Sequence, residues 1–254
     1  MDAVVLDHVD KAYTTYGTDI VLTGETRPSR TRQVLRGLSL TIPAGEITVI
    51  VGRSGCGKST LLSLMAGLDL PDSGQVLFEG TPTGDMDLDE YRRRKAAVIY
   101  QDFALFPWLN VLHNVEFGLR FTGIPRRKRC QIALKNLKSV GLDNFTQARI
   151  HELSGGMKQR IGLLQTLLTD ASLFLLDEPF NAIDINALNS IKLYIWEYLI
   201  KSNKTMIFIT HNIDQALLLS DRILIMRSPT ELLEIKPAKE YCSLSPDERI
   251  DTSD

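Results

Sequence analysis

The stretch Gly52-Arg-Ser-Gly-Cys-Gly-Lys58-Ser59-Thr60 decides the fold class of this 254-residue chain. It follows the apolar run at residues 47–51 and leads into the leucine-rich run at 61–66, so it matches G-x-x-x-x-G-K-[ST] between a predicted strand and a predicted helix. Glycines let backbone N–H groups turn inward around phosphate oxygens, and the start of a helix adds partial positive charge. A chance glycine-rich turn is the alternative, but this context favours a nucleotide-binding α/β protein.

Individual residues of this phosphate loop have separate expected roles. Lys58 is expected to contact the β- and γ-phosphates of ATP, and the Ser59 hydroxyl to ligate Mg²⁺. The residues that we expect to contact the nucleotide are Gly52, Ser54, Gly55, Cys56, Gly57, Lys58, Ser59 and Thr60. The motif alone fits kinases, GTPases and motor ATPases equally well.

Other short apolar runs predict the remaining core strands. Near-continuous runs that are each followed by a loop and a helical pattern are typical of buried parallel strands; they lie at residues 98–100, 173–176, 206–210 and 223–226. Residues 4–13 and 34–42 instead alternate apolar and polar side chains, which predicts an antiparallel pair joined by a long loop at 17–33. The expected fold class is α/β, with a mostly parallel core sheet and an antiparallel β subdomain.

Helical periodicity appears between residues 102 and 154, for example at 125–140, and predicts an inserted helical subdomain. Beyond residue 229 the chain becomes polar and acidic. We therefore expect one nucleotide-binding domain at 1–229, with its helical subdomain at about 102–160, and a short polar tail at 230–254.

Two acids and a histidine follow buried strands. Asp177 and Glu178 come after four apolar residues, at the strand end where open α/β sheets bind ligands. Asp177 is placed to hold Mg²⁺, and Glu178 to accept a proton from the attacking water; a surface turn is the alternative. His211 follows the run at 206–210 and is expected at the same edge, although a lone histidine there is usually a polar loop residue.

Composition limits the choice of partners and compartment. The formal net charge of −2 gives no bulk attraction to nucleic acid. Three widely separated cysteines without CxxC spacing fit reduced thiols better than a disulfide framework or a zinc site. No apolar stretch approaches the roughly 20 residues that span a bilayer. A protein of this kind that works at a membrane needs another protein to hold it there.

The most specific motif is Leu153-Ser154-Gly155-Gly156-Met157-Lys158-Gln159-Arg160, between the phosphate loop and the Asp177-Glu178-Pro179 strand end. In this order the motifs resemble ATP-binding cassette subunits of transporters, from residue 4 to about 226. The resemblance implies an ATPase that uses ATP and Mg²⁺ and pairs head to tail with a second ATP-binding subunit, either a copy of itself or a close homologue. Ser154, Gly155 and Gly156 are then expected to cap the ATP held by the opposite subunit. A glycine-rich helix cap is the alternative.

The same resemblance implies further roles. Tyr13 matches the aromatic residue that stacks on adenine, although Tyr16 is close enough to leave the choice open. Gln101 resembles the glutamine that touches Mg²⁺ and the attacking water and signals to the membrane subunits. Asp184 resembles the loop that couples the two sites, and it also fits a plain helix N-cap. Glu178 matches the catalytic base and His211 the γ-phosphate sensor.

The resemblance also implies partners and a location. It predicts transmembrane permease subunits, an extracytoplasmic solute-binding protein, no nucleic acid, and a peripheral position on the cytoplasmic face of the cell membrane. Pro107-Trp108-Leu109 resembles the nitrate, sulfonate and taurine importer group. The large apolar residues at 103–109 either pack in the core or form a groove for a permease helix. The alternative function is a soluble cassette ATPase in translation or DNA repair, a group whose members usually carry two cassettes or a long coiled coil.

Overall fold

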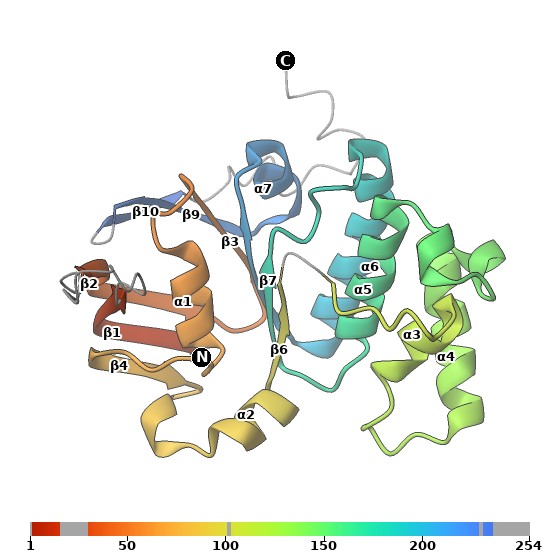
Figure 1. Ribbon diagram of the computed structural model, residues 1–254, viewed down its shortest axis with the longest axis horizontal. Coiled ribbons are helices and arrows are strands. Elements are labelled where there is room, and N and C mark those ends of the chain that lie inside the picture. The colour runs from red at the N-terminus through yellow and green to blue at the C-terminus, as the bar shows by residue number, and fades with distance from the viewer. Residues whose placement is uncertain (1, 16–29, 101–102, 229–230, 236–254) are drawn as a thin grey trace, which may run out of the picture.

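The computed structural model describes residues 2–15, 30–100, 103–228 and 231–235. Its centre is a six-stranded sheet in the order β10-β9-β3-β8-β7-β6 (Figure 1). All neighbours in this sheet are parallel except the edge strand β10, which runs antiparallel to β9. The strands are β3 (Ile47–Gly52), β6 (Ala96–Ile99), β7 (Leu173–Asp177), β8 (Thr205–Thr210), β9 (Arg222–Ser228) and β10 (Glu231–Ile235). The expected mostly parallel core sheet is confirmed.

A second, antiparallel sheet lies beside the first in the order β2-β1-β4-β5. Its strands are β1 (Asp2–Thr15), β2 (Arg30–Pro43), β4 (Ser73–Phe78) and β5 (Thr81–Pro82). The β1–β2 register places Tyr13 opposite Arg32. Because α1 (Lys58–Met65) lies between the two sheets, the phosphate loop at its start is close to both (Figure 1).

The other helices lie around and beyond the central sheet. In Figure 1, α5 and α6 lie next to the sheet, and α3 and α4 lie on the far side of α5 from it. The helices are α2 (Leu88–Arg94), α3 (Val111–Phe117), α4 (Arg126–Ser139), α5 (Gly155–Leu167), α6 (Ile185–Ser202) and α7 (Ile213–Leu219). Short 3-10 turns occur at Thr83–Asp85, Asp143–Phe145 and Ile150–Glu152. Helices α3, α4 and the start of α5 occupy the stretch for which a helical subdomain is expected.

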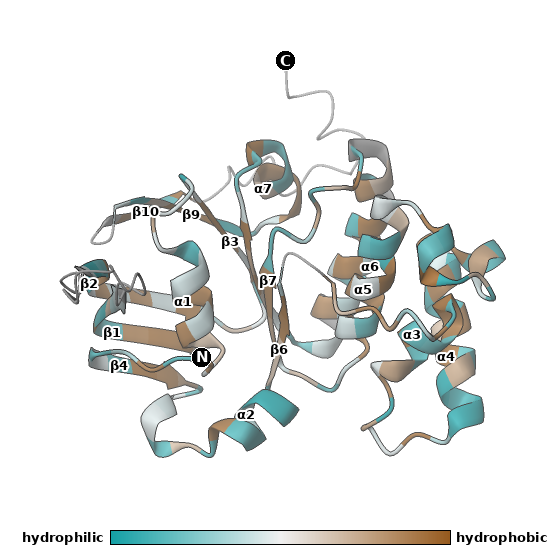
Figure 2. Cartoon of the chain, in the orientation of Figure 1, coloured by the Kyte–Doolittle hydropathy of each residue, from teal (hydrophilic) through white to brown (hydrophobic). Residues whose placement is uncertain are grey.

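The apolar core has two parts, one on each face of the central sheet. Successive residues of β7 alternate between them: Phe174 and Leu176 belong to the cluster with α5 and α6, and Leu173 and Leu175 to the cluster with α1 and the antiparallel sheet. All four side chains are fully buried. Burial on both faces explains why these strands are uninterrupted apolar runs, which are brown in Figure 2.

Some element boundaries differ from those expected from the sequence. Residues 30–33 belong to β2 and not to the expected loop, whose residues 17–29 lie outside the described part of the chain. The strand expected at 98–100 runs from Ala96 to Ile99. Within the stretch expected to be a polar tail, Glu231–Ile235 forms β10, and Arg222 on β9 donates a 2.5 Å hydrogen bond to Glu234 on β10.

No helix in the described ranges is both long enough and apolar enough to cross a membrane.

Candidate functional site

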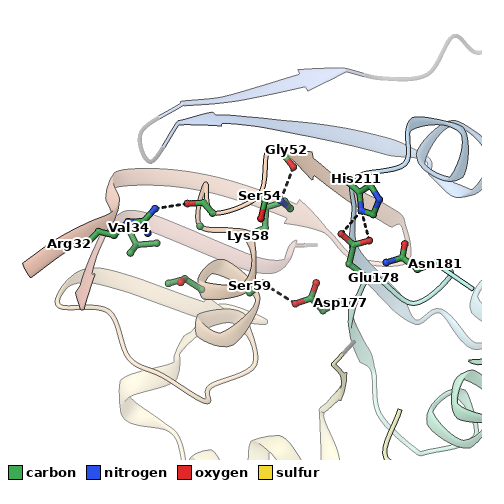
Figure 3. A pocket seen from close by; sticks show the side chains of 13 residues that line it. Arg32, Val34, Gly52, Ser54, Lys58, Ser59, Asp177, Glu178, Asn181 and His211 are labelled. Atoms are coloured by element: carbon green, nitrogen blue, oxygen red, sulfur yellow. Dashed lines mark hydrogen bonds and ion pairs between the residues drawn. The ribbon is translucent and has the colours of Figure 1, made fainter. Parts of the chain in front are cut away.

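A pocket of about 510 Å³ lies where the carboxyl ends of β3, β7 and β8 meet the start of α1. Three segments far apart in the sequence contribute to it: the phosphate loop, the end of β7 and the end of β8 (Figure 3). The lining residues are Arg32, Val34, Gly52, Ser54, Gly55, Gly57, Lys58, Ser59, Thr60, Asp177, Glu178, Asn181 and His211. This is the sheet edge at which open α/β folds bind ligands.

The phosphate loop is shaped by close backbone approaches. A methyl group on Gly52 would lie 2.6 Å from the Met226 carbonyl oxygen, so only glycine fits there. Gly57 has a φ of 110°, a backbone conformation that residues other than glycine rarely adopt. The Lys58 Nζ donates to the carbonyl oxygens of Gly52 and Arg53, at 2.7 and 2.9 Å. The lysine ammonium is therefore held over the loop that is expected to receive phosphates.

Ser59 and Asp177 meet across the pocket. The Ser59 hydroxyl donates a 2.9 Å hydrogen bond to Asp177 Oδ2, although the two residues are 118 positions apart. A hydroxyl and a carboxylate that face phosphate-binding backbone form a hard-oxygen donor set. Asp177 is the last residue of β7, so the strand itself fixes its position.

Glu178 and His211 form the second polar pair. The His211 Nδ1 lies 2.8 and 2.9 Å from the two carboxylate oxygens of Glu178. The Glu178 side chain is 17% exposed and the His211 side chain 68%, so the acid is the more sheltered partner. Glu178 has a φ of 51°, a left-handed conformation that is uncommon outside glycine, and its N–H donates to Ile209 on β8 at 2.9 Å. Strained backbone of this kind is typical of functional positions.

Ser154, Gly155 and Gly156 do not line the pocket. Ser154 caps α5 by accepting a 3.3 Å hydrogen bond from the Met157 N–H. A methyl group on Gly156 would lie 2.7 Å from the Ala182 carbonyl oxygen, so the start of α5 packs against the loop that follows Glu178. Asp184 accepts a hydrogen bond from the Ala187 N–H at 2.9 Å, as expected for the N-cap of α6.

The remaining candidates lie at the rim or outside the described residues. Tyr13 and Cys56 are absent from the residues that the structure describes as lining the pocket. The Tyr13 hydroxyl donates a 2.8 Å hydrogen bond to Asp69 Oδ2, which does not line the pocket. Cys56 Sγ lies 3.9 Å from the Lys58 Nζ. Gln101 and Tyr16 fall outside the described residues, so their expected positions stay predictions.

Three lining residues were not anticipated from the sequence: Arg32, Val34 and Asn181. Arg32 donates a 3.0 Å hydrogen bond to the Gly55 carbonyl oxygen of the phosphate loop. Its place depends on strand pairing, because the β1–β2 register sets it opposite Tyr13. Pairing the two alternating stretches of sequence as antiparallel strands, in the correct register, could have placed Arg32 at the pocket.

The strand–loop–helix cradle, the acids at the end of β7 and the histidine after β8 define a P-loop nucleotide-hydrolysing protein. A family model described as ABC transporter matches residues 35–181. An uncharacterised ABC transporter ATP-binding protein of Methanocaldococcus jannaschii is 40% identical over 207 residues, covering 80% of this chain and 74% of that protein. The taurine import ATP-binding protein of Burkholderia pseudomallei is 43% identical over 195 residues, covering 76% and 72% of the two chains.

A solved structure has a similar fold. It is a dimeric, post-hydrolysis ATP-binding cassette bound to ADP and Pi, with a TM-score of 0.78 and 30% identity, and the match covers 92% of this chain and 98% of that one. The chain belongs to the ABC transporter family, and it is an ATP-binding ATPase. The resemblance inferred from its motifs is thereby confirmed.

Proposed function

We propose that this chain energises the import of a small solute through partner permeases, by hydrolysing ATP in the pocket between the phosphate loop, Asp177 and Glu178. The observation that carries the proposal is the meeting of Glu178 and His211, 2.8 Å apart, in the same pocket as Lys58 and the Ser59–Asp177 pair. A lysine for phosphates, a carboxylate for a metal ion and a second carboxylate for a water proton are the parts that phosphoryl transfer to water requires.

Each polar residue has a separate role in this scheme. Lys58 and the loop N–H groups hold the β- and γ-phosphates. Glu178 accepts the proton of the attacking water, because its carboxylate is sheltered and is held in place by its contact with His211. The His211 Nδ1–H can donate to Glu178, and the other ring nitrogen can donate to a γ-phosphate oxygen when it also carries a proton. Ser59 and Asp177 suit Mg²⁺, which proteins usually hold with one or two carboxylates plus substrate phosphates and which would neutralise phosphate charge.

We infer that the working unit contains two ATP-binding subunits. Ser154 and Gly156 lie at the N-terminus of α5, where free N–H groups and the helix dipole favour an anion, yet neither residue lines the pocket of its own chain. If Ser154 and Gly156 cap the ATP bound by the opposite subunit, its phosphate is the anion at this helix N-terminus. The similar cassette of known structure is a dimer, which supports this arrangement.

A permease is the proposed partner at the helical side of the chain. Phe103 and Leu105 pack against the core, whereas Trp108 is 68% and Phe121 83% exposed. Phe117 links the exposed pair: its ring lies 4.4 Å from Phe106, which contacts Trp108, and 6.0 Å from Phe121. Phe103 and Leu105 are therefore core residues, whereas the exposed rings of Trp108 and Phe121 are suited to an interaction surface.

The proposed cargo is a small anion such as nitrate, a sulfonate or taurine. The Pro107-Trp108-Leu109 motif and the similarity to a taurine import subunit support this choice. Gln101, as in the family pattern, would connect nucleotide state to the permease. We place the chain on the cytoplasmic face of the membrane, with an extracytoplasmic solute-binding protein delivering the solute.

The test is affinity purification of the Glu178→Gln protein from native membranes with ATP and Mg²⁺, followed by mass spectrometry of the co-purifying chains. Recovery of a multi-spanning permease supports the proposal, and the same experiment with Lys58→Ala, which should bind ATP more weakly, is the matched control. Recovery of ribosomal or DNA-repair proteins without a permease would favour the soluble cassette alternative.

A further inference from the structure

A buried lysine on the antiparallel sheet faces the ring of Tyr13. Lys11 is 7% exposed, and its Nζ lies 5.3 Å from the centroid of the Tyr13 ring. The ammonium donates to Asp69 Oδ1 and to the Leu70 carbonyl oxygen, both at 2.7 Å, and Asp72 Oδ1 lies 3.6 Å away. A buried charge requires such partners, so this lysine is fixed in place and is not a solvated surface charge.

Asp69 joins this lysine to the tyrosine. One carboxylate oxygen accepts from Lys11, and the other accepts a 2.8 Å hydrogen bond from the Tyr13 hydroxyl. Burial alone would lower the pKa of Lys11, but the hydrogen bond and charge of Asp69 outweigh burial and raise it. Burial likewise acts to raise the pKa of Asp69, and hydrogen bonds from Lys11 and Tyr13 outweigh it and lower the pKa below its usual value. Both partners are therefore charged at neutral pH.

The contacts restrain the tyrosine at two places. Asp69 holds the hydroxyl, and the Lys11 ammonium lies over the ring, where the negative π face attracts a cation. Tyr13 is still 42% exposed, so its ring remains accessible to a ligand. A flat ring that is fixed before ligand arrives loses little freedom when a planar base stacks on it, which favours binding.

We propose that Lys11 and Asp69 are positioning residues that hold the Tyr13 ring as a preformed platform for the adenine base of ATP. This inference rests on the proposed binding and hydrolysis of ATP, and on the expectation from the family resemblance that Tyr13 stacks on adenine. Neither residue reaches the phosphates, so their loss changes affinity for the base and leaves the hydrolysis rate at saturating ATP unchanged.

The experiment compares dissociation constants for ATP and for inorganic tripolyphosphate, which has the phosphates without the base. The variants are Tyr13→Phe, which keeps the ring and removes the hydroxyl, Asp69→Ala, and the two combined. Each single variant is expected to weaken ATP binding about three- to tenfold, the range of one typical hydrogen bond, with tripolyphosphate binding unchanged. The double variant should bind ATP no more weakly than Asp69→Ala, because both changes remove the same hydrogen bond.

Asp72→Ala is the matched control, since it removes a carboxylate near Lys11 that does not bond the Tyr13 hydroxyl. An ATP loss as large as that of Asp69→Ala would overturn the inference, as would additive effects in the double variant or an equal loss of tripolyphosphate binding. If Asp69→Ala does not fold, Tyr13→Phe alone decides, and unchanged ATP affinity overturns the inference. Tyr13→Ala tests the adenine contact separately: if this variant leaves the ratio of the two dissociation constants unchanged, Tyr13 is not the adenine contact, and the proposed hydrolysis at Glu178 is not affected by that result.

Discussion

Replacing Glu178 by glutamine should separate hydrolysis of ATP from its binding. The amide keeps the size of the side chain and its place near His211, but it cannot accept a proton from water. Loss of a positioned general base typically costs a factor of about 10² to 10⁴ in rate, which is about 3 to 5 kcal/mol in the activation barrier. Affinity for ATP should stay within about twofold, because Lys58 and the loop that hold the phosphates are unchanged.

The assay is steady-state ATP hydrolysis at saturating ATP and Mg²⁺, with the ATP dissociation constant measured on the same preparations. Glu90→Gln is the matched control, since it makes the same chemical change on an exposed residue of α2 that does not line the pocket, and it should hydrolyse ATP at the wild-type rate. A Glu178→Gln protein with a kcat within about threefold of wild type would refute the assignment of the base.

Three further predictions concern binding and stability. Lys58→Ala should weaken ATP binding at least about tenfold in a filter-binding assay, because a hydrogen-bonded charge on the phosphates is lost, whereas an unchanged affinity would remove Lys58 from the site. Gly118→Ala should lower the free energy of unfolding by about 1–3 kcal/mol in urea titrations, because the added methyl group would lie 2.0 Å from the Gln165 carbonyl oxygen. The control is Gly84→Ala, where the added methyl group meets open space, and it should change the free energy of unfolding by less than about 0.5 kcal/mol. Hydrogen bonds from Lys11 and Tyr13 lower the pKa of Asp69 in the folded chain, so the stability that its carboxylate contributes is present above the unfolded value of 3.8 and is lost as pH falls through the folded pKa. The difference in free energy of unfolding between wild type and Asp69→Asn should therefore narrow as pH falls below 3.8.

The sequence was most informative where chemistry constrains neighbouring residues. The phosphate loop, the strand that ends at Asp177 and the strand before His211 were all predicted, because a buried parallel strand and its following loop are local patterns. The strand β4 was missed because its first residues, Ser73 to Gln75, are polar and exposed. Strand β10 was missed because it is a short edge strand, Glu231–Ile235, followed by a polar stretch of sequence.

Contacts between segments that are distant in the sequence could not be predicted from local patterns. Asp69 reaches Lys11 across 58 positions, and nothing near either residue announces the pair. Arg32 enters the pocket only through the pairing of β1 with β2. The sequence placed Glu178 and His211 at the same edge of the sheet but did not predict that they touch. The 2.8 Å distance between His211 Nδ1 and Glu178 Oε1 is a tertiary feature, and Glu178 adopts a left-handed backbone conformation there.

The most direct test of the central claim is the molar mass of the Glu178→Gln protein in solution by light scattering, with ATP and Mg²⁺ and again with ADP. If the second ATP-binding subunit is a copy of this chain, we expect about twice the chain mass of 28.5 kDa with ATP, which Lys58 of one copy holds and Ser154 of the other caps, and the single-chain mass with ADP. A mass of 28.5 kDa in both nucleotides, at concentrations where ATP is bound, would contradict the claim that two copies of this chain close around ATP.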